Sequence, residues 1–126
     1  MRQLVALIFA VAAFCGSSSN AMAWNWTEKD SMWQLAYLAV HVADWGQTRD
    51  IAAQCEGGGY YETNPVLGRC PSAQWVNTYF LGTALLHTGL AHWMPGKYRR
   101  MFQAATIGME VGYVTNNARI GLNVRF

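Results

Sequence analysis

The sequence predicts a mainly α-helical protein, a small bundle of about three helices that follows an N-terminal signal, with a disulfide-stapled loop and a short C-terminal strand. Three observations support this fold class. Apolar residues recur at helical spacing along much of the chain, helix-starting and helix-breaking residues divide it into three segments, and two cysteines bracket a stretch rich in Gly and Pro.

Residues 1–23 have the organisation of an export signal. Arg2 supplies a basic start, an apolar run covers residues 4–14, and residues 21–23 form the A-x-A pattern of a cleavage site. Cleavage leaves residues 24–126 as a single helical domain, whereas an uncleaved anchor helix is the alternative. The signal predicts an exported protein, placed either in the inner membrane facing the periplasm or in the periplasm.

The first helix is expected over about 28–52. Thr27 or Asp30 can cap its N-terminus, and acidic residues in the opening turn favour a helix start. Its apolar and polar residues recur on different faces, so this helix is amphipathic. That pattern suits a surface or an interface better than a lipid-surrounded span.

Cys55 and Cys70 form an even pair once Cys15 leaves with the signal. In an oxidising compartment such a pair predicts a disulfide, here closing a loop whose Gly and Pro content no helix or sheet would hold in place. The spacing excludes a C-x-x-C redox motif. A structural zinc site needs more ligands than these two thiols supply.

Two further helices are expected, over about 73–94 and 101–115. The first of these contains no formal charge and is long enough to cross a bilayer core, and the basic residues 97–100 precede the other as they would at a cytoplasmic hairpin end. A membrane hairpin of these helices is one interpretation, and an exported soluble bundle is the other. Residues 118–126 alternate apolar with polar side chains, which predicts a short edge strand or an amphipathic continuation of the third helix.

Four polar residues in these helices are candidates for chemistry: His41, Asp44, His87 and Glu110. In a folded bundle they could converge, and His with carboxylate is a ligand set suited to a divalent metal such as Zn²⁺. The same residues are candidate catalytic acids and bases, and Glu62 in the stapled loop is a fifth. The alternative is a hydrogen-bonded packing network. No cofactor other than such a metal is expected.

A further pattern joins residues 44–49 (DWGQTR) to residues 62–68 (ETNPVLG), with Glu110 later in the chain. It resembles a pattern in small uncharacterised exported or membrane proteins of bacteria and phages. The resemblance implies interest in Asp44, Gln47, Glu62, Asn64 and Glu110, but it implies no activity.

The composition narrows the class of function. The net charge is only +2 and the charged fraction is 13%, so there is no basic footprint for nucleic acid. With no recognisable catalytic motif, the sequence predicts a non-enzymatic cell-envelope protein, membrane-associated and acting through protein or lipid contacts. A homo-oligomer or another envelope protein is an expected partner. The alternatives are a metal-dependent enzyme at the membrane face and a phage-type lysis or pore factor.

Overall fold

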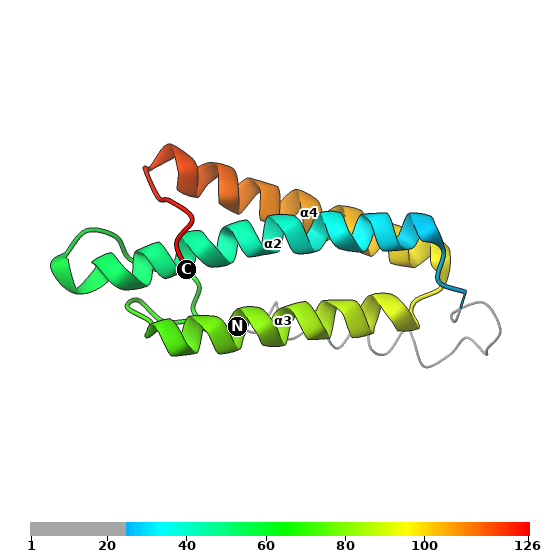
Figure 1. The fold of residues 1–126 in the computed structure, drawn as a ribbon, viewed down its shortest axis with the longest axis horizontal. Coiled ribbons are helices and arrows are strands. Elements are labelled where there is room, and N and C mark those ends of the chain that lie inside the picture. The colour runs from blue at the N-terminus through cyan, green and yellow to red at the C-terminus, as the bar shows by residue number, and fades with distance from the viewer. Residues whose placement is uncertain (1–24) are drawn as a thin grey trace.

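The computed structural model describes residues 25–126, which fold into three long helices and one short one (Figure 1). They are α2 (Glu28–Gln54), the 3-10 helix η1 (Cys55–Gly57), α3 (Ala73–Trp93) and α4 (Gly96–Arg119). α2 lies along both α3 and α4, with α3 antiparallel to it and α4 parallel (Figure 1). The prediction of a mainly helical bundle is confirmed. The predicted signal lies outside the described residues.

α2 begins at a capping box. The Thr27 side chain accepts a hydrogen bond from the Asp30 backbone N–H at 3.2 Å, and the Thr27 N–H donates to Asp30 Oδ2 at 3.0 Å. Two backbone donors of the first turn are satisfied in this way, which fixes the start of the helix. The sequence therefore placed this start correctly and its end within two residues.

The loop between α2 and α3 is held by the disulfide Cys55–Cys70, whose Cα atoms lie 5.6 Å apart. This confirms the predicted pairing and indicates an oxidising, extracytoplasmic location. The loop covers a small apolar cluster at this end of the bundle, in which Leu67 packs on Val76 and Phe80 of α3. Ser72 then caps α3 by accepting a hydrogen bond from the Trp75 N–H.

α4 starts at Gly96 and ends at Arg119, so it is longer than the predicted 101–115 at both ends. The basic residues expected in a turn form its first turn instead, because the Arg99 N–H donates to the Pro95 carbonyl and its side chain reaches back to carbonyl groups at the end of α3. The Arg99 guanidinium donates five charge-assisted hydrogen bonds, which stabilise the helical conformation of this segment.

The predicted C-terminal strand is wrong, since residues 120–126 form no strand in the described structure. The tail instead crosses α2. The Arg125 N–H donates to the Gly46 carbonyl, and the Asn123 N–H donates to Asp50 Oδ2 at 2.9 Å. A Cβ atom at position 46 would collide with the Val124 side chain, so the glycine allows this close approach.

The predicted membrane-spanning hairpin over 73–94 and 101–115 also needs correction. None of the helices within residues 25–126 has both the length and the apolar character needed to cross a membrane. α3 is uncharged, but Asn, Thr and His side chains interrupt its apolar residues, and α4 carries basic residues in its first turn and a glutamate in its middle. These groups lower the mean hydropathy of both segments.

Candidate functional site

A row of polar side chains runs through the interior of the bundle, and we call it the polar row. It begins at the buried residues Asp30 and Arg99, where the two side chains form an ion pair of 2.8 Å. Both are almost fully enclosed, so an uncompensated charge here would be costly. The row continues along the facing sides of all three helices through these residues: Gln103, Gln34, His87, Tyr37, His41, Glu110, Asp44 and Asn117.

The first part of the polar row is a set of hydrogen bonds between side-chain amides. Gln103 Nε2 donates to Gln34 Oε1 at 3.1 Å and to the Asp30 carbonyl at 3.2 Å. Gln34 Nε2 in turn donates to His87 Nδ1 at 3.2 Å and to Thr88 Oγ1 at 3.0 Å. These bonds tie α2 to α3 and α4 through buried polar groups, whose desolvation is offset only while they remain paired.

His87 is held as a neutral imidazole. Its Nδ1 accepts from Gln34, so its Nε2 carries the proton and donates to Thr106 Oγ1 at 2.8 Å, because the Thr106 hydroxyl itself donates to the Phe102 carbonyl. Burial, with a smaller contribution from the charge of His41, lowers the pKa of His87 to about 4. His87 is therefore uncharged at neutral pH.

His41 has the opposite environment. Its Nε2 lies 3.1 Å from the Phe80 carbonyl, and its Nδ1 lies 2.8 Å from Glu110 Oε1, so acceptors face both ring nitrogens. Burial disfavours the imidazolium, but the hydrogen bonds to Glu110 and Phe80 outweigh it and raise the pKa of His41. The Tyr37 ring lies between the two histidines, stacked on His87 at 3.5 Å and on His41 at 5.1 Å between ring centroids.

Asp44 lies one turn beyond His41 on α2. Asn117 Nδ2 of α4 donates to its Oδ1 at 3.1 Å. Burial, followed by the negative charges of Glu110 and Glu62, raises the pKa of Asp44 to about 7. A carboxyl group with this pKa changes its charge near neutral pH.

Glu62 reaches this place from the stapled loop. Its Oε1 accepts a hydrogen bond from the Asn64 N–H at 2.7 Å, while Asn64 Nδ2 donates to the Tyr79 hydroxyl of α3 at 2.9 Å. The disulfide and these bonds fix the loop, so the Glu62 charge acts on Asp44 and on Tyr79. Gln47, the remaining residue of the sequence pattern, donates to the Val114 carbonyl on α4.

The structure thus brings together four of the five predicted candidates: His41, Asp44, Glu62 and Glu110. His87 lies farther along the polar row, separated from His41 by the Tyr37 ring. Within residues 25–126, no group of three or more His, Cys, Asp or Glu side chains has the arrangement needed to hold a metal ion. The site is a hydrogen-bond network of buried polar side chains.

Sequence reasoning missed Gln34, Tyr37, Arg99 and Gln103 as members of the polar row. All four are buried, and Arg99 and Gln103 expose none of their surface. Gln34, Tyr37 and His41 do share one helical face by steps of three and four residues, and that spacing was the signal that could have found them. Arg99 gave no such signal, because a basic pair next to a Pro-Gly turn is typical of a solvated loop.

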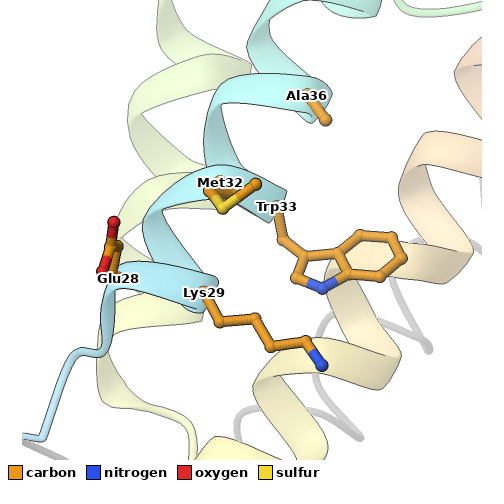
Figure 2. A pocket seen from close by; sticks show the side chains of 5 residues that line it. All are labelled: Glu28, Lys29, Met32, Trp33 and Ala36. Atoms are coloured by element: carbon orange, nitrogen blue, oxygen red, sulfur yellow. The ribbon is translucent and has the colours of Figure 1, made fainter.

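A pocket on the opposite side of α2 contains none of these residues. Figure 2 shows the five side chains that line it, all from the first turns of α2: Glu28, Lys29, Met32, Trp33 and Ala36. It offers one carboxylate and one ammonium at the edge of an apolar wall. Because no residue of the polar row lines this pocket, the pocket and the candidate site are separate features.

Comparison of the chain with protein-family models, with curated proteins and with solved structures finds no match. The fold and the site define a three-helix bundle with a polar interior, and its function must be inferred from that arrangement.

Proposed function

We propose that this protein is an exported cell-envelope protein that binds the apolar part of a lipid membrane through the outside of its helical bundle and acts by contact, without catalysis. One observation carries this proposal: many polar side chains of the helices are buried inside the bundle, while many large apolar side chains are exposed on its outside. This is the reverse of the usual arrangement in a water-exposed bundle.

Large apolar side chains are exposed on all three long helices, and together we call them the apolar band. Leu85 exposes 75% of its surface, and Met32 and Leu35 each expose 66%. The further exposed members of this band are Val42, Leu81, Leu86, Met101, Met109 and Val111. Exposed apolar patches of more than a few hundred Å² are unusual on a monomer and indicate a partner surface.

The charges of the bundle support lipid as that partner. α3 carries no formal charge from Ala73 to Trp93, and α2 carries none from Ser31 to Ala43. The single acidic residue between Met101 and Ala118 of α4 is Glu110, whose side chain is 15% exposed and bonded to His41. The charged residues gather instead at the two ends of the bundle. A band without charges around several helices suits acyl chains, which offer neither charge nor hydrogen bonds.

Two tryptophans add to this interpretation. Trp75 in the first turn of α3 is 43% exposed, and Trp93 in its last turn is 66% exposed. Tryptophan is enriched where apolar and polar layers of a membrane meet, because its ring is apolar and its N–H seeks a polar partner. The two rings therefore lie at the borders expected for a lipid-contacting band.

Flotation with lipid vesicles tests the proposal. The protein purified from the cell envelope after export should float with vesicles of neutral phosphatidylcholine, and the addition of anionic lipid or salt should change the floated fraction little, because the band is uncharged. Leu85→Lys should reduce the floated fraction several-fold. Thr63→Lys, which adds the same charge to the exposed loop, is the matched control and should behave as wild type.

Two outcomes would contradict the proposal. Equal flotation of Leu85→Lys and Thr63→Lys would show that the apolar band does not contact lipid. Wild-type protein that stays with the aqueous phase as a stable dimer would show instead that a second copy of the chain covers the band.

A further inference from the structure

The region around Asp44 joins titratable groups from the three long helices and from the stapled loop. Asp44 and His41 come from α2, Glu110 from α4 and Glu62 from the stapled loop. The tyrosines that face this group are Tyr37 of α2 and Tyr79 of α3. Three carboxyl groups, one buried imidazole and two phenols therefore influence one another electrostatically in this region.

The His41–Glu110 pair holds one proton between its 2.8 Å partners. Nε2 of His41 faces the Phe80 carbonyl and the Thr83 hydroxyl oxygen, whose own proton has carbonyl acceptors, so this nitrogen must carry a proton. The second proton lies between Nδ1 and the Glu110 carboxylate. Whether it resides on the nitrogen or on the oxygen, the pair as a whole is neutral.

The same region is short of hydrogen-bond donors. Glu110 Oε2 is buried and has no hydrogen-bond partner among the described residues. Gln47 lies three residues after Asp44 on α2 and exposes only 3% of its surface. Its Oε1 is also buried and has no hydrogen-bond partner among the described residues. Buried acceptors without donors raise the free energy of the folded state, and a proton that enters the cluster relieves part of this cost.

We propose that His41, Glu110 and Asp44 form a proton-binding site, in which His41 and Glu110 keep the proton that lies between them and the Asp44 carboxylate takes up and releases another proton. The step is a simple protonation, in which a proton from water adds to an Asp44 carboxylate oxygen and no other bond changes. Because Asp44 bonds to Asn117 and His41 bonds to Glu110, the site joins α2 to α4 at two points.

The charges around Asp44 support this assignment. Glu110 and Glu62 oppose a third negative charge, the His41 imidazolium favours it, and burial opposes it most strongly. The balance raises the pKa of Asp44 to about 7, within the range where proton uptake responds to small changes in pH. This proposal does not depend on lipid binding.

A pH titration of the full-length protein tests the site. The chain contains three aspartates, so ¹³C labelling of their side-chain carboxyl groups gives three NMR signals, of which Asp44→Asn identifies one. The Asp44 signal should titrate with a midpoint near 7. The ¹⁵N shifts of His41 should show that Nε2 carries a proton at that pH, as the acceptors around it require.

Charge variants complete the test. Glu62→Gln should move the Asp44 midpoint down by about half a pH unit or more, because it removes a negative charge that opposes ionisation. Glu56→Gln, at an exposed position of η1, is the matched control and should leave the midpoint unchanged. A wild-type midpoint below about 5, close to that of an ordinary aspartate, would overturn the proposal. Equal effects of the two glutamine variants would overturn it as well.

Discussion

Leu85 and His87 lie two positions apart on α3 and have opposite surroundings: Leu85 exposes 75% of its surface, and His87 exposes 5%. Side chains two positions apart on a helix point in directions that differ by about 200°, so Leu85 lies on the outside of the bundle and His87 on the inside. The apolar side chain faces outward and the imidazole faces inward. This inversion is the basis of the lipid-binding proposal.

The buried ion pair at the charged end of the bundle gives the first prediction. Arg99→Met should lower the free energy of unfolding by about 3–5 kcal/mol, because it leaves the enclosed Asp30 carboxylate without its main partner. Arg100→Met is the matched control. The Arg100 side chain is 46% exposed and its Nε lies 3.5 Å from the same carboxylate, so its loss should cost less than about 1 kcal/mol. Urea unfolding measures both, and equal effects would contradict the role assigned to Arg99.

The neutral state of His87 predicts a loss of stability in acid. The pKa of His87 is about 4 in the folded protein and about 6.5 in the unfolded chain, so between these values the unfolded state binds more protons. Stability from this group is complete above about pH 6.5 and decreases as the pH falls toward 4, by about 2 kcal/mol at pH 5.

Comparison of variants isolates this effect, because the raised pKa of Asp44 changes stability in the opposite sense between about pH 4 and 7. The difference between wild type and His87→Gln, followed by urea unfolding from pH 7.5 to 4.5, removes the contribution of Asp44. It should decrease by about 2 kcal/mol as the pH falls to 5. His92→Gln, at a less buried position, is the control. A difference that does not change with pH would mean that His87 is protonated in the folded protein.

The disulfide predicts a local effect on stability. Cys55 and Cys70 are separated by 15 residues, and closing a loop of that length contributes about 3 kcal/mol in the chain-entropy model. The double variant Cys55→Ser with Cys70→Ser should lose about this much in urea unfolding and gain rapid backbone hydrogen exchange in residues 56–69. Its far-ultraviolet circular dichroism should stay close to that of wild type. Loss of all helical signal would show that the loop is required for the helices.

Two glycines predict changes of opposite sign. At Gly46 an added methyl group would collide with the Val124 side chain and lie 3.2 Å from the Arg125 backbone nitrogen, so Gly46→Ala should displace the C-terminal tail and lower the melting temperature. At Gly89 nothing lies within 4 Å of the added atom, and Gly89→Ala should stabilise α3 by up to about 1 kcal/mol. Thermal unfolding compares them. A stabilising Gly46→Ala would contradict the described position of the tail.

The sequence predicted the three helices because their limits carry local signals. Thr27 with Asp30, Ser72 after Pro71, and the Pro95-Gly96 pair act within one turn of the chain and need no tertiary contact. The pairing of Cys55 with Cys70 followed from the number of cysteines in the exported part.

Features that depend on contacts between distant segments were not predicted. Residues 96–100 are helical because Arg99 bonds to the end of α3 and to Asp30, a contact across 69 positions that no local pattern shows. The alternation of residues 118–126 indicated a strand, but no second strand exists among the described residues to pair with it, and the tail bonds to α2 instead. Periodicity identified His41 as a polar residue of a helix. Its meeting with Glu110 required the packing of α2 on α4.

The most direct test of lipid contact is the accessibility of a spin label at position 85. A nitroxide on Leu85→Cys, in a Cys15→Ser background with the disulfide intact, is compared with one on Thr63→Cys in the presence of phosphatidylcholine vesicles. Lipid contact predicts that the label at position 85 collides readily with oxygen and is shielded from a water-soluble nickel chelate, whereas the label at position 63 shows the reverse. Equal access of the nickel chelate to both labels would contradict the proposal that the apolar band binds lipid.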